Sequence, residues 1–143
     1  MRDLCFKRAI GRFQNILIGL MSELDALRQP LTSDVCFTGP VAKRMAEAVR
    51  SYPDVFVTPM AAVAGAVADE VLAATLSENL PQKAYVNNGG DIAFHLSEGE
   101  IFEVLSPAGL LTITSQDSAR GIATSGWQGR SHSLGIADAV SVV

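Results

Sequence analysis

The residues best suited to bind a ligand lie in a short polar stretch between two apolar segments. Asn87 and Asn88 carry amides that can donate and accept hydrogen bonds, and Asp91 carries a carboxylate. Between them, Gly89 and Gly90 permit positive φ and the close approach of a ligand or another backbone. Such a stretch is typical of a tight turn between strands. A carboxylate is disfavoured within a strand, however, so a ligand-binding loop is the second interpretation.

A second loop, over residues 119–135, is dense in glycines and small hydroxyl residues. Arg120 and Arg130 flank it and could pair with an anion. His132 could carry a proton or contact a ligand. A plain surface loop would have the same composition. As a binding loop, its candidates for holding a phosphate or a sugar edge are Thr124, Ser125 and Gly126.

Neither loop matches a standard nucleotide-binding motif or a catalytic motif. No Gly-Lys-Ser/Thr follows the glycines, and their spacing is not that of a dinucleotide fingerprint. Cys5 and Cys36 are isolated cysteines without a CxxC pair, so we assign no metal site. No nucleophile and base can be paired from the sequence, which leaves open whether the protein is an enzyme.

Composition indicates one globular domain over residues 1–143. Apolar residues make up 48% of the chain and charged residues 18%, which is typical of a folded protein. The net charge of −4 argues against nucleic acid and anionic membranes as partners. We judge the apolar run over residues 55–68 too short to cross a bilayer, and we expect a cytoplasmic protein.

Three helices are expected in the first half of the chain. The first, over residues 7–28, has apolar residues at three-to-four spacing that we expect to face inward. The second begins after Thr38, the expected cap, and reaches about residue 51. The third, over residues 59–76, is rich in alanine, so neighbours can approach it closely. The expected inward residues of the first helix are Ile10, Phe13, Ile16, Leu17, Leu20, Leu24 and Leu27.

The second half of the chain has the composition of strands. Glu98 and Gly99 predict a two-residue hairpin turn that pairs the segment before it with the segment after it. Helices followed by strands predict an α+β fold, with N-terminal helices packed on a mainly antiparallel sheet. The apolar end of the sequence suggests a fragment, or a strand that a partner covers. The expected strands are residues 84–87, 91–96, 101–105, 110–114, 121–124 and 139–143.

Four blocks in this order resemble an uncharacterised family related to the ApbE-type FAD:protein FMN transferases: residues 59–66, 87–92, 121–126 and 131–140. The resemblance implies an ApbE-like fold related to the T-fold, FAD and Mg²⁺ as cofactors, and transfer of FMN to a protein. Residues 87–91 are similar to the Asn-Ala-Gly-Gly-Asp block of these enzymes, with Asn88 in place of alanine. Residues 123–126 match their Ala-Thr-Ser-Gly block.

The chain also departs from the pattern of these transferases. The Ala-Lys-Gly lysine of the family is absent near Gly65, and Val142 stands where the metal-binding segment would have threonine. We therefore expect a binder of a flavin or another small phosphorylated molecule. The alternatives are a Mg²⁺-dependent FMN transferase that uses FAD, and a non-catalytic subunit of a homo-oligomer.

Overall fold

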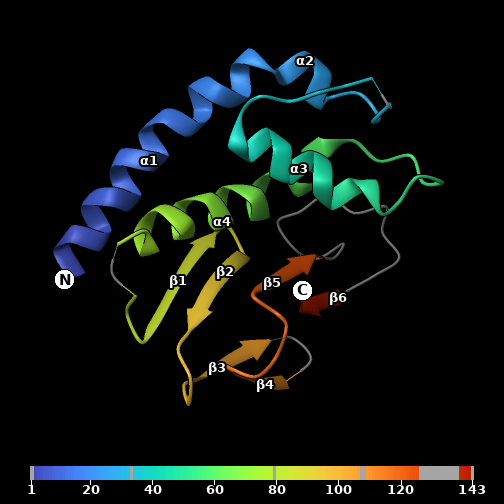
Figure 1. Ribbon diagram of the computed structural model, residues 1–143. Coiled ribbons are helices and arrows are strands. Elements are labelled where there is room, and N and C mark those ends of the chain that lie inside the picture. Colours follow the sequence, from blue (N-terminus) through green and yellow to red (C-terminus); the bar gives the residue numbers. More distant parts are fainter. Residues whose placement is uncertain (1, 33, 79, 107–108, 126–138, 143) are drawn as a thin grey trace.

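The computed structural model describes residues 2–32, 34–78, 80–106, 109–125 and 139–142, and it has the predicted α+β architecture. Helices lie on one face of a four-stranded antiparallel sheet, and a separate two-stranded sheet lies near its other face (Figure 1). The helices come first in the sequence and the strands follow, as the change in composition predicts.

The first helix starts and ends earlier than predicted, and its buried face is a different one. Helix α1 (Arg2–Ser22) begins five residues before the expected start, and a short helix α2 (Leu24–Leu27) follows. Ile16 and Leu27 are buried, but Ile10, Phe13 and Leu17 are 58%, 60% and 67% exposed. The prediction that these three face inward is therefore wrong. The helix has two apolar faces, and sequence spacing cannot tell which of them meets the core.

Helix α3 (Pro40–Arg50) agrees with the prediction, but its expected cap does not. Gly39 is the N-cap residue and Thr38 does not cap the helix with its side chain. Instead, the carboxylate of Glu23 accepts hydrogen bonds from the amides of Thr38 and Gly39, at 2.6 and 3.1 Å. Desolvation opposes ionisation of this carboxylate, yet the Thr38 and Gly39 bonds prevail and lower its pKa. A residue 16 positions away thus caps the helix.

The alanine-rich segment is the central helix of the fold. A 3₁₀ turn, η1 (Pro59–Ala62), leads into helix α4 (Val63–Leu76). By length and composition alone, Pro59–Leu76 could cross a membrane, because it has 18 residues and a mean hydropathy of 1.4. The run judged too short in the sequence, residues 55–68, covers only part of this segment. In the fold, α4 contacts α1, α3, β1 and β2. Its small, apolar residues are explained by these close contacts on several sides.

The main sheet has the strand order β1-β2-β5-β6, and all its pairs are antiparallel. Its strands are β1 (Lys83–Asn88), β2 (Asp91–Leu96), β5 (Gly121–Ser125) and β6 (Ala139–Val142), close to the predicted bounds. Residues alternate between its faces. Ala93 packs with Ala68 and Leu72 of α4, whereas Phe94 packs on the opposite face in a cluster with Ile113 and Ile122.

The predicted hairpin between β2 and the next strand does not form. Strand β3 (Ile101–Ser106) pairs with β4 (Gly109–Thr114) in a separate sheet, and β5 takes the place beside β2. The amide of Glu100 donates to the carbonyl of Ser97, and Gly99 has a φ of 81°. The amide of Gly99 also donates to Ser115 Oγ at 3.1 Å, which ties the turn to the end of β4. The turn at Gly99 therefore forms, but it leads the chain into the second sheet and does not pair β3 with β2.

Candidate functional site

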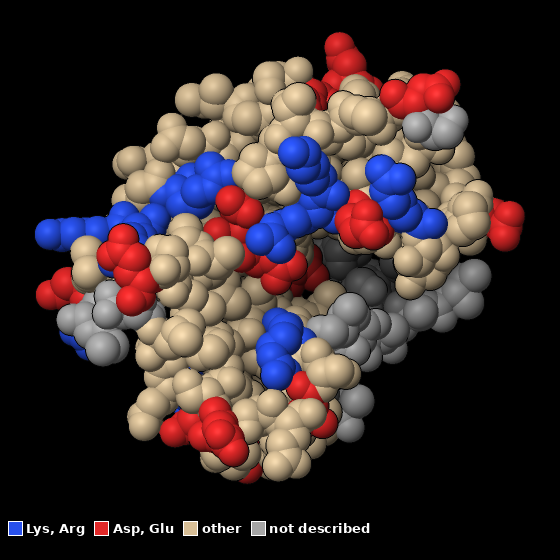
Figure 2. Space-filling model, in the orientation of Figure 1, with Lys and Arg blue, Asp and Glu red and all other residues tan. Residues whose placement is uncertain are grey.

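A pocket of about 340 Å³ lies between helices α3 and α4 and the face of the sheet formed by β2 and β5. We call it the aspartate–arginine pocket, because its charged lining residues are Asp69, Asp91, Arg44 and Arg120. Figure 2 shows acidic and basic side chains gathered around a hollow on this face of the molecule. Its remaining lining is small and apolar, so the four charged groups dominate its chemistry.

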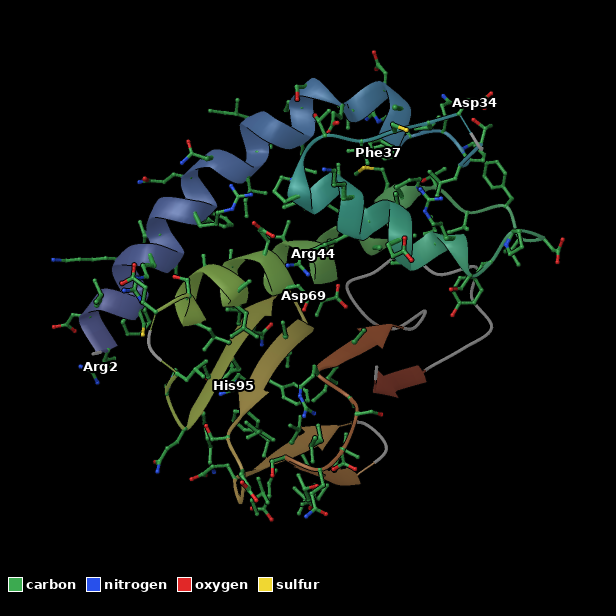
Figure 3. The ribbon with its side chains drawn as sticks, in the orientation of Figure 1. Arg2, Asp34, Phe37, Arg44, Asp69 and His95 are labelled. Atoms are coloured by element: carbon green, nitrogen blue, oxygen red, sulfur yellow. The ribbon has the colours of Figure 1, made fainter. Side chains whose placement is uncertain are left out.

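The helices supply one wall of the pocket. Ala62, Gly65 and Asp69 lie on the same side of the α4 segment and all line the pocket. A Cβ added at Gly65 would meet nothing within 4 Å, so the space above this glycine is open. Arg44 reaches the pocket from α3, and Figure 3 shows Arg44 and Asp69 close together beside α4. The small residues of α4 leave room for a ligand beside a carboxylate.

The sheet supplies the other wall, because alternate side chains of a strand point to the same face. Asp91 and Ala93 project from the α4-facing side of β2, and Ala93 pairs with Gly121 of β5. Arg120 immediately precedes β5, and its carbonyl accepts a hydrogen bond from Phe94 at 2.9 Å. The antiparallel register therefore brings together two chain segments that lie about thirty residues apart in the sequence.

Two desolvated carboxylates face this pocket. Desolvation by the surrounding protein raises the pKa of Asp91. Desolvation also raises the pKa of Asp69, against the opposing charge of Arg44. Asp69 keeps contact with solvent, whereas Asp91 is half-buried. Among the described residues, none donates a hydrogen bond to the side-chain carboxylate of Asp91. Burial therefore disfavours the ionised form of Asp91 without a compensating donor, which makes Asp91 a candidate functional residue.

Arg120 presents a cation that its own turn holds in place. Its Nη1 donates to the carbonyls of Asp117 and Ala119, and its Nη2 donates to the carbonyl of Ser115 at 3.1 Å. Neutral carbonyls orient the guanidinium but leave it positively charged. Asp117 accepts hydrogen bonds from the amide and hydroxyl of Thr114, which lower its pKa and stabilise the same turn.

In a second charge cluster beside α4, the acidic and basic side chains pair with one another. Glu70, next to Asp69 in the sequence, accepts hydrogen bonds from Arg12 Nε at 2.8 Å and Arg44 Nε at 3.1 Å. Desolvation of Glu70 is outweighed by these hydrogen bonds and charges, so its pKa is lowered. Arg44 thus connects this ion-pair cluster to the pocket.

The predicted loop over residues 87–91 forms a tight turn, and its members have different surroundings. Asn87 Oδ1 accepts a hydrogen bond from the amide of Gly90 at 2.9 Å, and Asn88 Nδ2 donates to the carbonyl of Ala64 at 3.0 Å. These bonds close the turn and fasten it to α4. Gly89 and Gly90 have φ values of 70° and 115°, which explains both glycines. A Cβ at either would meet nothing within 4 Å.

The candidates in the second loop are placed less fully. Thr124 and Ser125 form the end of β5, opposite Val140 and Ala139 of β6. Gly126 and His132 lie outside the described residues. Of the seven predicted ligand-binding residues that the structure describes, Asp91 is the one that lines the pocket. For all nine, ligand binding stays a prediction.

Sequence reasoning missed Asp69 and Arg44 and noticed Arg120. Asp69 ended an apolar stretch and Arg44 was one of several basic residues on a helix, so neither stood out. The available signal was the spacing of Gly65 and Asp69, which places an open position and a carboxylate one turn apart on a helix. Arg44 carried no signal, since only packing of α3 against α4 brings it here.

The pocket alone does not form a protein-held metal site. Within the described ranges, no three His, Cys, Asp or Glu side chains are grouped closely enough to bind a metal ion. Two carboxylates could share a divalent cation only with a ligand that completes its coordination.

Comparison with known proteins corrects the predicted resemblance. No curated protein and no solved structure matches the chain. The matching family model is AbpE bacteria, over residues 2–143, and it is a different family from the ApbE-type flavin transferases. The resemblance to those transferases is therefore wrong. The ApbE-like fold, the T-fold relation and the FAD and Mg²⁺ chemistry that it implied have no support from this match. The chain belongs to the AbpE bacteria family.

Proposed function

We propose that the aspartate–arginine pocket binds a small phosphorylated molecule of about mononucleotide size. The observation that carries the proposal is the convergence of two guanidinium groups and two desolvated carboxylates in one pocket. Its volume of about 340 Å³ lies at the lower end of the range for small-molecule sites, which spans roughly 300–1,000 Å³. A mononucleotide or a sugar phosphate suits this size better than a dinucleotide.

The arginines support recognition of the phosphate group. Guanidinium groups bind phosphate through paired N–H donors, and such charge-assisted bonds are stronger than neutral ones. Arg120 is oriented by backbone carbonyls and lines the pocket, and we infer that it offers its charge to a ligand although the Asp117 carboxylate also interacts with it. Arg44 gives one donor to Glu70, and it also lines the pocket, where its charge acts on Asp69.

The carboxylates define the rest of the ligand. A phosphate beside Asp91 would be repelled unless a divalent cation or a hydroxyl group lay between them. A ribose or other polyol supplies such hydroxyls, and carboxylates are good acceptors for them. We therefore infer a ligand with a phosphate at the arginines and hydroxyl groups at Asp91 and Asp69. A flavin mononucleotide has this composition, as do other nucleoside monophosphates.

Isothermal calorimetry with FMN, AMP and inorganic phosphate, with and without Mg²⁺, tests the proposal. We expect FMN or AMP to bind more tightly than phosphate, and Arg120→Gln to weaken binding at least tenfold. Arg28→Gln, an exposed arginine far from the pocket in sequence, is the control and should bind like the wild type. Equal binding by Arg120→Gln and the wild type would refute the phosphate site.

A second variant tests the location without changing any charge. Gly65→Leu places a side chain in the open space beside Asp69, so it should block the ligand while leaving the helix intact. Gly19→Leu, at an exposed position of α1 that does not line the aspartate–arginine pocket, is the matched control, because a Cβ there also meets nothing within 4 Å. Undiminished binding by Gly65→Leu would move the ligand out of this pocket.

The setting that goes with this function is the cytoplasm, where phosphorylated metabolites are available. The net charge of −4 supports a small molecule over nucleic acid or an anionic membrane as the partner. The pairing of Glu70 on α4 with two arginines supports a packed core helix over a membrane span.

A further inference from the structure

The outer face of α1 carries a long apolar stripe that nothing in the described part of the chain covers. Its members recur at three-to-four spacing along the helix. Monomeric proteins rarely expose contiguous apolar patches larger than about 300–600 Å². We call it the α1 stripe, and it consists of Phe6 (59% exposed), Ile10 (58%), Phe13 (60%), Leu17 (67%) and Met21 (58%).

The same face is almost free of charge. From Ala9 to Ser22, Arg12 is the one charged residue of α1, and it turns inward to Glu70. Covering the stripe would therefore bury no charge in this part of the helix, and the desolvation cost would be small. Helices that lie on membranes carry basic residues along their polar face, whereas the basic residues of α1 lie in its N-terminal half, where Arg8 pairs with Glu78 and Arg12 with Glu70. A protein surface suits this face better than a membrane.

The stripe is also complementary to itself. If two copies of α1 lie antiparallel about a two-fold axis between Phe13 and Gln14, Phe6 comes opposite Met21 and Ile10 opposite Leu17. An isologous dimer requires this kind of self-complementary pattern. The Phe–Met contact has the additional attraction of sulfur for an aromatic ring.

The available area agrees with a dimer. The five side chains present on the order of 500 Å² of apolar surface, against about 800 Å² per partner in a standard interface that includes its polar rim. Beside Phe6 the stripe continues into an apolar groove of about 620 Å³ between α1, the end of α4 and β1, which reaches Tyr85. In Figure 1, α1 lies along the outer edge of the molecule, where a second copy has access.

We propose that the α1 stripe is the interface of a homodimer in which the α1 helices of two copies pack antiparallel. Light scattering coupled to size exclusion at about 50 µM tests it. We expect a mass of about twice 15.1 kDa for the wild type and about 15.1 kDa for Leu17→Glu. The control is Leu110→Glu on β4, because Leu110 is 65% exposed and Leu17 is 67% exposed. This control should stay dimeric.

Three results would overturn the proposal: a monomeric wild type, a dimer that persists in Leu17→Glu, or loss of the dimer in both variants. Binding of a wild-type monomer to phosphatidylcholine vesicles would assign the stripe to a membrane instead. Circular dichroism of Leu17→Glu checks that the monomer is folded. Because Leu17 is exposed, we expect an unchanged spectrum apart from any effect of dissociation.

Oxidative crosslinking tests the antiparallel arrangement separately. In a Cys36→Ser background, which removes the exposed cysteine, Gln14→Cys should form a covalent dimer because Gln14 lies next to the two-fold axis. Lys7→Cys should not, because the two copies of residue 7 would be roughly 20 Å apart along the helices. Equal crosslinking by both variants would contradict the arrangement.

Discussion

Asp69 and Glu70 are neighbours in the sequence, yet they belong to opposite kinds of environment. Glu70 accepts hydrogen bonds from Arg12 and Arg44, and its pKa is lowered. Asp69 faces the pocket together with Asp91, and desolvation raises the pKa of both. The fold satisfies the Glu70 carboxylate, whereas Arg44 offsets the desolvation of Asp69 only in part and no described residue offsets that of Asp91. Carboxylates whose ionisation is opposed by burial are the better candidates for function.

The contrast between Asp69 and Glu70 predicts first that Glu70 stabilises the fold. Glu70→Gln should lower the free energy of unfolding by about 1–3 kcal/mol at pH 7, because two arginines would lose their counter-charge in a partly buried site. The lowered pKa implies that this stabilisation is present at neutral pH and is lost as the pH falls through the folded-state pKa. Urea unfolding at pH 7 and at pH 3 measures both effects.

The control for this prediction is Glu47→Gln. Glu47 pairs with Arg50 at 3.3 Å, but its side chain is 80% exposed, so the change should cost no more than about 0.5 kcal/mol. Equal losses for Glu70→Gln and Glu47→Gln would mean that the Glu70 cluster contributes no more than a surface ion pair.

The turn that carries Asp91 into the pocket should show the next largest effect. Gly90 has a φ of 115°, so Gly90→Ala should cost about 1–2 kcal/mol through backbone strain, although a Cβ there meets nothing within 4 Å. Gly11→Ala lies within α1 with equally open surroundings, and it should stabilise by about 0.5–1 kcal/mol. Thermal unfolding compares the two. Stabilisation by Gly90→Ala would disprove the strained turn.

Neutralising Asp91 should have the smallest effect on stability, with the opposite sign. Because the pKa of Asp91 is raised, its ionised form costs stability once the pH exceeds the ordinary pKa, and this cost is complete above the folded-state pKa. Asp91→Asn should therefore stabilise the protein by up to about 1 kcal/mol at pH 7 and lose this advantage at pH 3. Differential scanning calorimetry at the two pH values measures it. Destabilisation at pH 7 would show an unrecognised partner of the carboxylate.

The positions of helices and strands were predictable because they depend on local spacing. Strand β2 begins at Asp91 and ends at Leu96 as predicted, and α3 begins at Pro40. Strand pairing was harder to predict, because the apolar residues of β3 come in adjacent pairs, Ile101-Phe102 and Val104-Leu105, and do not favour β2 or β4 as the partner. The turn around Gly99 is bonded to Ser115, a contact that local sequence does not reveal.

The site was predictable only in part, for the same reason. Asp91 stood out because a carboxylate opens an apolar strand, and Arg120 because it flanks a glycine-rich loop. Arg44 and Asp69 are ordinary helix-surface residues until α3 packs beside α4 above the sheet. The face of α1 shows the limit most clearly, since Ile10 and Ile16 look equivalent in sequence and only Ile16 is buried.

The most direct test of the central claim is an NMR titration of the ¹⁵N-labelled chain with FMN and AMP. Our account predicts that the amides of Gly65, Asp69, Asp91 and Gly121, from both walls of the aspartate–arginine pocket, shift together with one apparent affinity. Amides of β4, such as Leu110 and Leu111, should not move. Unchanged spectra with both ligands, or shifts confined to residues outside the pocket, would contradict the assignment of this pocket to a phosphorylated small molecule.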